Sequence, residues 1–243
     1  MKLIVLDIDG VLALGEAQAF DLTLFQRLAT LNRLARRDDS LPSVTLNTGR
    51  PSPYVEAVMQ AIDAWQPALY ESGAGLYSPE SYQFQETPLM TKEDKKALNQ
   101  IVDIVDKAVV QTGKAYWQPG KTICHSLFAI SPYTIDDITE EMTVTLAQYS
   151  ENFIVVPAIV ALNIQPKHIS KGTGLDWLSQ VTGIDMADMA GVGDSMADAD
   201  FLKLLGYPVA AANATDDVKA VAKYVSPYHA AAGLHDILDY WGV

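Results

Sequence analysis

The chain has 243 residues, of which 49% are hydrophobic and 19% are charged, and its formal net charge is −13. This composition excludes a disordered chain, and the length suits one large or two modest domains. The acid excess argues against nucleic acid and against an anionic membrane surface as partners, because both require a basic footprint. One cysteine, Cys124, excludes an internal disulfide. No apolar run reaches the about 18 residues of a membrane span, so we expect a cytoplasmic enzyme or binding protein.

The first 79 residues alternate predicted strands with predicted helices. Strand patterns cover 3–6, 43–47 and 68–70, and helix patterns cover 21–37 and 51–62. Asp21 is a candidate N-cap of the first helix, and Pro51 and Pro53 are tolerated in the first turn of the second. This βαβαβ order predicts a parallel, doubly wound sheet.

The order of elements changes near residue 80. Helix patterns cover 91–110 and 135–149, and strand patterns cover 116–117, 122–130, 153–156 and 160–164. An αββαββ order predicts an α+β unit with helices on one face of an antiparallel sheet.

Alternation of strands and helices returns after Pro166. Helices are predicted at 171–181, with Ser170 as N-cap, at 197–205, with Gly206 as its stop, and at 216–224 and 234–240, and strands are predicted at 189–192 and 209–211. We therefore expect a doubly wound, mostly parallel, Rossmann-like core made of residues 1–79 and 167–243. Residues 80–166 form an inserted α+β domain in this interpretation.

Polar side chains follow several predicted core strands, where open α/β sheets bind their ligands. They are Asp7 and Asp9 after the first strand, Thr48 after the second, Asp194 and Asp198 after a later one, and Lys171 at a helix start. Clustered carboxylates favour Mg²⁺ when a phosphate completes its coordination shell, and a lysine and a hydroxyl suit phosphoryl oxygens. Each feature alone has a structural explanation as a turn, a helix cap or a solvated lysine. Their conjunction, each after its own strand, favours chemistry.

Four motifs of this chain resemble those of the haloacid dehalogenase superfamily of aspartate-nucleophile phosphotransferases. They are Asp7-Ile8-Asp9-Gly10-Val11-Leu12, Thr48-Gly49-Arg50, Lys171-Gly172, and Gly193-Asp194-Ser195 through Asp198. The resemblance covers the whole chain, and the insertion resembles the C2 cap of the Cof-like, type IIB branch. Within that branch the sequence is similar to archaeal-type phosphoglycolate phosphatases, and sucrose-phosphate phosphatases share the same core motifs.

The resemblance implies a role for each of the matching residues. Asp7 would attack phosphorus and form an aspartyl-phosphate, and Asp9 would act as general acid and then as general base. The implied substrate-binding residues are Thr48, Gly49, Arg50, Lys171 and Asn213. The implied Mg²⁺ ligands are Asp7, Asp9 through its carbonyl, Asp194 and Asp198. Arg50 has the alternative role of a structural tether.

Two positions depart from the type IIB pattern. Ala197 stands where an asparagine is usual before the second acid of the fourth motif, and Ser72 replaces the asparagine of Glu-Asn-Gly after the third strand. In the cap, Trp117, Lys121 and His125 are candidates for choosing the leaving group, although each has a structural alternative.

The expected function is that of a Mg²⁺-dependent phosphomonoesterase acting on a small phosphorylated metabolite, with phosphoglycolate or a sugar phosphate as leading substrates. A phosphomutase built from the same parts is the closest alternative. A phosphorylatable signalling module also uses Asp, Mg²⁺, Thr and Lys, but such a module is shorter and places its Asp after a middle strand. A binding protein without turnover would not require Asp7, Asp9, Thr48, Lys171 and Asp194 together. The oligomeric state does not follow from the sequence.

Overall fold

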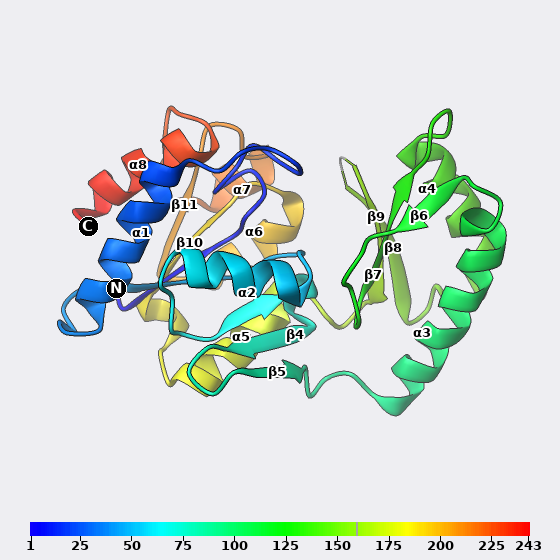
Figure 1. The fold of residues 1–243 in the computed structure, drawn as a ribbon, viewed down its shortest axis with the longest axis horizontal. Helices are drawn as coiled ribbons and strands as arrows, with labels where there is room; N and C mark the ends of the chain where they lie inside the picture. Colours follow the sequence, from blue (N-terminus) through cyan, green and yellow to red (C-terminus); the bar gives the residue numbers. More distant parts are fainter. Residues whose placement is uncertain (159) are drawn as a thin grey trace. The chain divides into compact units, whose positions relative to one another are not determined.

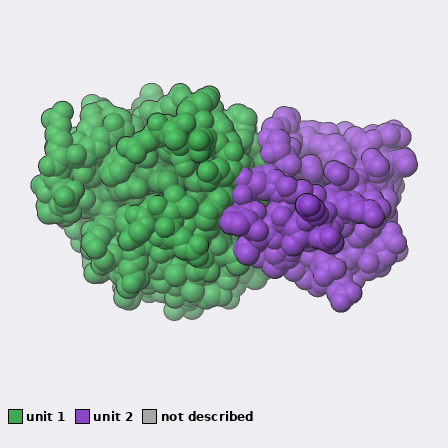
Figure 2. Space-filling view, turned by 90° about the horizontal axis from the view of Figure 1, so that it is seen from below, with its two compact units in different colours: residues 1–85, 170–243 green, residues 86–169 purple. Residues whose placement is uncertain are grey.

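The computed structural model describes residues 1–158 and 160–243. The chain divides into two compact units, Met1–Gln85 with Ser170–Val243 and Glu86–Ile169, which Figure 2 colours separately. The boundaries expected from the sequence, 79/80 and 166/167, lie a few residues earlier in the chain. The first unit extends to Gln85 because a hairpin that the sequence analysis did not predict continues it.

A five-stranded parallel sheet forms the centre of the first unit (Figure 1). Its strands, in the order β12-β11-β10-β1-β2, are β12 (Tyr224–Val225), β11 (Tyr207–Ala210), β10 (Met189–Gly193), β1 (Leu3–Leu6) and β2 (Ser43–Leu46). Every residue of β1, β2 and β10 is buried. All four pairings are parallel, so the prediction of a doubly wound, mostly parallel core is confirmed.

Helices flank this sheet. They are α1 (Leu22–Ala35), α2 (Ser52–Ala61), α5 (Lys171–Thr182), α6 (Met196–Leu202), α7 (Asp216–Val221) and α8 (Ala230–Trp241). Leu3 and Val5 of β1 belong to one buried cluster with apolar side chains of α5, α6 and α7. The alternate residues Ile4 and Leu6 point to the opposite face of the sheet and are also fully buried. Figure 1 shows α1 and α8 side by side, and Arg27 joins them through Asp239 at 2.6 Å.

A small second sheet continues the first unit. It contains β3 (Ala68–Tyr70), β4 (Gly75–Ser78) and β5 (Gln83–Glu86) in that order, with a 3₁₀ turn at Glu71–Gly73. The sequence analysis placed β3 in the parallel sheet and did not predict β4 or β5. In the structure a parallel bridge between Asn47 and Leu69 joins β3 to the end of β2.

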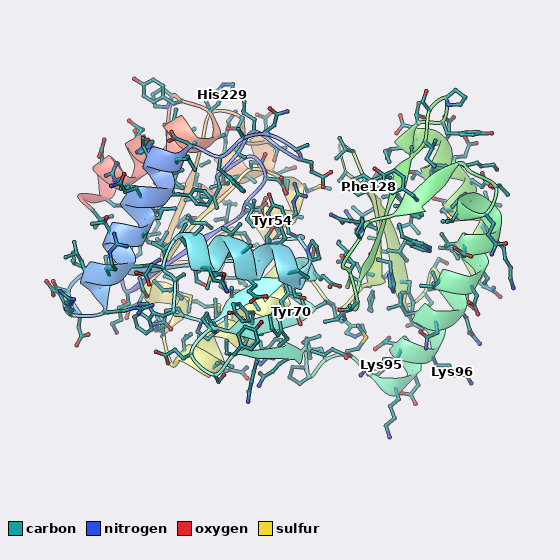
Figure 3. The ribbon with its side chains drawn as sticks, viewed as in Figure 1. Tyr54, Tyr70, Lys95, Lys96, Phe128 and His229 are labelled. Carbon is teal, nitrogen blue, oxygen red and sulfur yellow. The ribbon has the colours of Figure 1, made fainter. Side chains whose placement is uncertain are left out.

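The second unit has the predicted αββαββ order. Its helices are α3 (Lys92–Val105), which continues as a π-helical turn over Asp106–Val110, and α4 (Ile135–Thr145), followed by a 3₁₀ turn at Ala147–Tyr149. Its antiparallel sheet has the order β6-β7-β9-β8, made of β6 (Ala115–Trp117), β7 (His125–Ala129), β9 (Leu162–Pro166) and β8 (Phe153–Pro157). Apolar residues of both helices and of the sheet form one buried cluster that includes Ile101, Leu127 and Ile138. Phe128, labelled in Figure 3, lies 5.3 Å from the Tyr116 ring across the β6–β7 pair.

The two predicted N-caps are confirmed, whereas two helix ends were predicted wrongly and the helix predicted from residue 234 begins at Ala230. Asp21 accepts from the amides of Thr23 and Leu24, and Ser170 accepts from the amide of Thr173, so both act as N-caps. The helix predicted over 216–224 ends at Val221, and Tyr224–Val225 pairs with β11. Gly206 does not end α6, which stops at Leu202. In the described part of the chain, no helix combines the length and apolarity needed to cross a membrane.

Candidate active site

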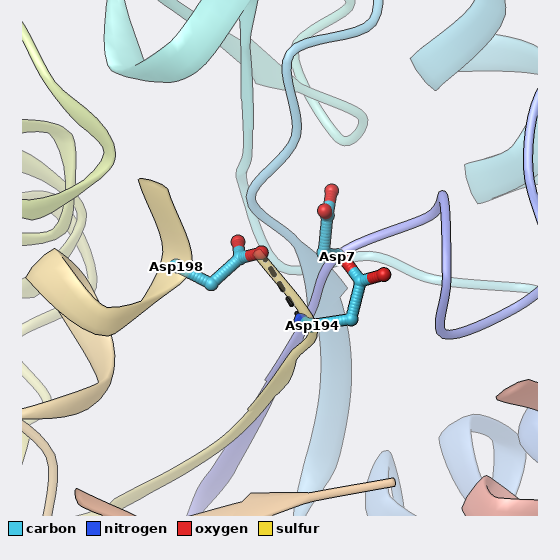
Figure 4. Close-up of side chains that lie close together, drawn as sticks. All are labelled: Asp7, Asp194 and Asp198. Atoms are coloured by element: carbon cyan, nitrogen blue, oxygen red, sulfur yellow. Dashed lines mark hydrogen bonds between the residues drawn. The ribbon is translucent and has the colours of Figure 1, made fainter. Parts of the chain in front are cut away.

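Two neighbouring strand ends bring two carboxylates together. Asp7 follows β1 and Asp194 follows β10, and these strands pair in register, with Leu6 opposite Val192. The Asp7 amide extends the ladder by donating to the Val192 carbonyl at 3.0 Å. Asp198, in the first turn of α6, completes a cluster in which one oxygen of each acid lies within 4.8 Å of the others (Figure 4). The predicted convergence of these three acids is therefore present in the geometry.

Lys171 places a buried positive charge between two of these acids. Its Nζ lies 2.9 Å from Asp7 Oδ2 and 2.5 Å from Asp198 Oδ1, and its side chain is 5% exposed. Burial disfavours the ammonium form, but the carboxylates of Asp198 and Asp7 outweigh burial, so the pKa of Lys171 is raised. The lysine thus stays protonated and orients one oxygen of Asp7.

The other oxygen of Asp7 is a buried acceptor with no hydrogen-bond partner among the described residues. Burial raises the pKa of Asp7 to about 6, with repulsion from Asp198 and Asp9 adding to the effect and Lys171 opposing it. Burial likewise raises the pKa of Asp194 to about 7, with Asp7 and Asp198 as the next causes. A buried oxygen without a donor is costly unless a ligand or ion uses it.

Asp198 differs from the other two acids because protein donors occupy both of its oxygens. Oδ1 accepts from Lys171, while Oδ2 accepts from the amide of Asp194 at 3.1 Å and from the amide and hydroxyl of Ser195 at 2.9 and 2.7 Å. Asp198 therefore holds the loop that carries Asp194 and also holds the amine of Lys171. The carboxylate oxygens of Asp7 and Asp194 accept fewer hydrogen bonds from the protein and are better placed to coordinate an ion.

Gly10 makes room for Asp194. It has a φ of +75°, in the left-handed region that glycine adopts readily, and a Cβ at this position would lie 1.8 Å from Asp194 Oδ2. The close approach explains why a glycine follows Asp9 in this motif. The side-chain amide nitrogen of Asn213 joins these two residues: it donates to the Gly10 carbonyl at 2.9 Å and lies 3.4 Å from Asp194 Oδ2.

The carboxylate of Asp9 is directed to Arg50. Nε of Arg50 donates to Asp9 Oδ2, and Nη2 donates to Oδ1, both at 2.7 Å. The guanidinium also lies 3.5 Å from a carboxylate oxygen of Glu16 and 4.7 Å from the centre of the ring of Tyr54, which Figure 3 labels. The side chain of Asp9 is not one of the three clustered acids. In this geometry Arg50 holds the Asp9 side chain, which corresponds to its alternative role as a structural tether.

The remaining predicted site residues lie in turns around this centre. Thr48 is buried after β2, and its Oγ1 accepts from the Arg50 amide at 3.3 Å. A Cβ on Gly49 would lie 3.4 Å from Ser72 Oγ, an ordinary contact, so close packing does not require glycine there. Asn213 uses its amide oxygen as well, accepting from the Ala230 amide at 2.8 Å. Both amide atoms of Asn213 therefore serve protein contacts.

The two departures from the motif pattern lie at different places. Ala197 is exposed on α6 and offers no polar group. Ser72 has a left-handed φ of +59° and donates its amide to the Thr48 carbonyl at 2.9 Å. The turn at Glu71–Gly73 therefore supports the loop of Thr48 through its backbone.

In the second unit, two of the three candidates contact each other, and the third contacts Ser126, the residue after His125. The rings of Trp117 and His125 lie 5.5 Å apart, and Lys121 Nζ donates to Ser126 Oγ at 2.6 Å. Burial lowers the pKa of His125, and the charge of Lys121 adds to this effect. His125 is therefore a partly buried imidazole whose cationic form is disfavoured.

Two residues around Lys171 carried no role in the sequence analysis. Asn47 Nδ2 donates to the Lys171 carbonyl at 3.0 Å, and Asp200 Oδ2 accepts from the hydroxyl of Ser170 at 2.6 Å. Ser170 and Thr173 give a local signal for the start of α5. No local sequence pattern indicates that Asp200 of α6 contacts the first turn of α5.

The residues present fit a divalent cation of the Mg²⁺ kind. The donors are carboxylate oxygens, which hard cations prefer. Asp7 has an unpartnered buried oxygen. Burial, and to a smaller extent repulsion among the acids, raises the pKa values of Asp7 and Asp194, so their ionised forms are disfavoured unless a cation lies beside them.

A Rossmann-like core with an inserted αββαββ unit and a carboxylate–lysine centre at its strand ends defines an α/β enzyme with its site at the carboxyl edge of the sheet. A family model described as haloacid dehalogenase-like hydrolase matches residues 117–238, which is half of the chain. The chain belongs to this family. The superfamily and the hydrolase class expected from the motifs are thereby confirmed.

Individual proteins similar to this chain span its whole length. A phosphoglycolate phosphatase of Methanococcoides burtonii is 24% identical over 242 residues, covering 99% of this chain and 96% of that protein. The solved structure of Thermoplasma acidophilum 0175 has a TM-score of 0.76 and 18% identity, covering 100% of this chain and 98% of that one. A solved haloacid dehalogenase subclass IIB sugar phosphatase has a TM-score of 0.71 and 16% identity, covering 100% and 99%. At these identities the structural likenesses establish the fold.

Proposed function

We propose that this hydrolase is a phosphomonoesterase that cleaves a small phosphorylated metabolite through a covalent phosphate on Asp7. The observation that carries the proposal is the state of Asp7. One oxygen is fixed by Lys171, and the other is buried and without a partner among the described residues. A nucleophile of this kind is held in one orientation and keeps an oxygen available for phosphorus.

In the first half of the reaction, a carboxylate oxygen of Asp7 attacks phosphorus and the bond between phosphorus and the ester oxygen breaks. Asp9 gives its proton to the departing alcohol oxygen. Lys171 and the hydroxyl of Thr48 hold the phosphoryl oxygens while charge shifts among them. Burial of Lys171 strengthens this interaction because the surrounding medium screens it less than water does.

In the second half, water attacks the phosphorus of the aspartyl-phosphate. Asp9, now ionised, accepts a proton from that water, and the bond between phosphorus and Asp7 breaks. The products are inorganic phosphate and the original carboxylate of Asp7. Asp9 thus returns to its protonated form at the end of each turnover.

Asp7, Asp194 and the main-chain carbonyl of Asp9 would hold Mg²⁺, which when bound neutralises phosphate charge and polarises the phosphoryl group. Asp198 supports this arrangement by holding the Asp194 loop and the Lys171 amine. The whole chain carries a formal charge of −13, so the lysine and the cation together allow an anionic substrate to approach an acidic site.

We propose phosphoglycolate as the first substrate to test and sugar phosphates as the second. The name of the full-length relative from Methanococcoides burtonii supports phosphoglycolate. Sugar phosphates share the phosphate ester and differ in the leaving alcohol, so a comparison isolates selection by the leaving group.

The test is the release of inorganic phosphate from phosphoglycolate and from a panel of sugar phosphates, with Mg²⁺ and with excess chelator. We expect release that requires Mg²⁺ and is abolished in Asp7→Asn. Asp176→Asn, which changes an exposed carboxylate of α5, is the matched control and should retain activity. Circular dichroism of each variant checks that the fold is intact.

Substantial activity in Asp7→Asn would overturn the nucleophile, and full activity in chelator would overturn the metal requirement. Transfer of the phosphoryl group to a second hydroxyl of the substrate, without release of phosphate, would identify the phosphomutase alternative.

A further inference from the structure

The first turn of α5 is held by a residue of another helix. Ser170, the N-cap, accepts from the Thr173 amide at 3.2 Å and donates its own hydroxyl proton to Asp200 Oδ2 at 2.6 Å. Asp200 lies in α6, thirty residues further along the chain. Because the first amides of a helix lack partners within the helix, the position of this turn depends on such external contacts.

Gly172 allows Asp200 to come this close. A Cβ on Gly172 would lie 2.5 Å from Asp200 Oδ2, so a larger residue would push the carboxylate away from the turn. Burial raises the pKa of Asp200, but hydrogen bonds from Lys203, from Ser170 and from the Gly172 amide outweigh burial and lower it overall. Asp200 is therefore an ionised acceptor at the positive end of α5.

Lys171 lies between the two residues that Asp200 contacts. Its carbonyl accepts from Asn47 Nδ2 at 3.0 Å, and its Nζ reaches Asp7 and Asp198. Asp198 and Asp200 are two residues apart on α6 and therefore point in different directions from it. Helix α6 thus contacts the lysine region twice. Asp198 binds the amine of Lys171, and Asp200 binds the first turn of α5, in which Lys171 lies.

We propose that Asp200 is a positioning residue for Lys171, fixing the first turn of α5 so that the lysine amine lies between Asp7 and Asp198. The effect on turnover rests on the proposed function, in which Lys171 holds phosphoryl oxygens. The effect on the lysine itself does not depend on turnover.

The first test observes the Lys171 ammonium group by proton–nitrogen NMR of the magnesium-loaded protein, with the signal assigned by its loss in Lys171→Arg. In the native protein we expect a signal protected from exchange with water, because the amine is buried and paired. Asp200→Ala should broaden or abolish this signal. Asp200→Asn should preserve it, because the amide oxygen still accepts from the Ser170 hydroxyl.

The second test measures kinetics on the best phosphate ester found. We expect Asp200→Ala to lower kcat/KM about ten-fold, the size of effect typical when a partner that orients a functional group is removed. Asp200→Asn should stay close to the native value, because its amide oxygen still accepts from the Ser170 hydroxyl. Lys203→Met breaks the exposed ion pair with Asp200 at 2.7 Å, leaves the Ser170 contact intact, and should leave both readouts unchanged.

If Asp200→Ala fails to fold, Ser170→Gly replaces it, since glycine is accepted at an N-cap at a cost of a few tenths of a kcal/mol and removes the hydroxyl that contacts Asp200. An unchanged lysine signal in whichever of these variants folds would overturn the positioning role. Equal losses in Lys203→Met would also overturn it. A lost signal together with no phosphatase activity in the native protein would instead support the positioning role and reject the proposed function.

Discussion

Arg50 binds both carboxylate oxygens of Asp9, with Nε and Nη2 each 2.7 Å from a different oxygen. The Arg50 side chain is only 11% exposed, and bidentate pairs of this kind are strong and directional. An oxygen that accepts a guanidinium N–H is not free to deliver a proton to a leaving group. One contact with Arg50 must therefore open before Asp9 can act as the proposed acid.

Arg50→Lys should lower kcat about ten-fold, because a lysine replaces the planar fork with one point contact and leaves Asp9 less well oriented. Steady-state kinetics on the best phosphate ester would measure the change. The control is Arg36→Lys, since Arg36 is exposed and pairs with Asp63 on the surface. An unaltered kcat in Arg50→Lys would mean that Asp9 needs no orientation by the guanidinium.

Asp9→Asn should reduce kcat on an alkyl phosphate by about 10²–10⁴-fold, the usual contribution of general acid–base catalysis. An activated aryl phosphate needs no proton on its leaving group, so its first half-reaction should survive the substitution. Stopped-flow absorbance should then show a burst of about one phenolate per protein, followed by slow turnover. A steady native rate without a burst would argue against Asp9 as the proton carrier.

Gly10→Ala should weaken Mg²⁺ binding about 10–100-fold, because its Cβ would displace the Asp194 carboxylate that lies 1.8 Å from the Cβ position. Gly113→Ala is a close control. Gly113 also has a φ of +75°, but nothing lies within 4 Å of its Cβ position. Both variants therefore have the same backbone strain, and only in Gly10→Ala does the added Cβ overlap another side chain, the Asp194 carboxylate. Calorimetric titration with Mg²⁺ measures the difference, and equal affinities in the two variants would place Asp194 outside the metal site.

Metal-free protein should become less stable as pH rises from about 5 to about 8. The folded pKa values of Asp7 and Asp194, about 6 and about 7, lie above the ordinary 3.8, so the folded state holds more protons than the unfolded state in this window. Stability is then lost as these acids ionise. The lowered pKa of His125 acts in the opposite sense, and the raised pKa of Lys171 lies above the window.

Asp194→Asn isolates this effect, since it removes one of the two acids and leaves His125 in place. Melting temperatures measured in chelator should vary less with pH in Asp194→Asn than in the native protein, and Mg²⁺ should flatten the native profile. Identical pH profiles of the two proteins would contradict the raised pKa of Asp194 in the folded, metal-free protein.

The sequence predicted the parallel core and the convergence of its acids because both depend on strand ends. Asp7 and Asp194 each follow a buried apolar strand, and parallel strands bring such ends to one edge of a sheet. Ser170 and Asp21 were recognisable as N-caps because a cap acts on its own helix. These features are local, or follow from topology alone.

Features that depend on distant partners were not predictable. Tyr224 was predicted as the last residue of a helix, whereas pairing with β11 makes Tyr224–Val225 a strand. The strand β5 is exposed throughout and has Phe84 as its one apolar residue, so no alternation of apolar residues marks it. Gly206 looked like a helix stop, whereas its Cβ position lies 1.8 Å from the Ala187 carbonyl, a close approach that only the folded chain creates.

Strand β1 obtains its two neighbours from distant parts of the chain. β2 follows β1 after one helix, but β10 lies more than 180 residues beyond the end of β1. At about 5–20 residues per second, a ribosome needs roughly 10–40 seconds to supply those residues. Throughout that interval one edge of β1 is without its native partner while the inserted unit emerges. During synthesis this unpaired edge stays exposed until β10 pairs with it and brings Asp194 beside Asp7.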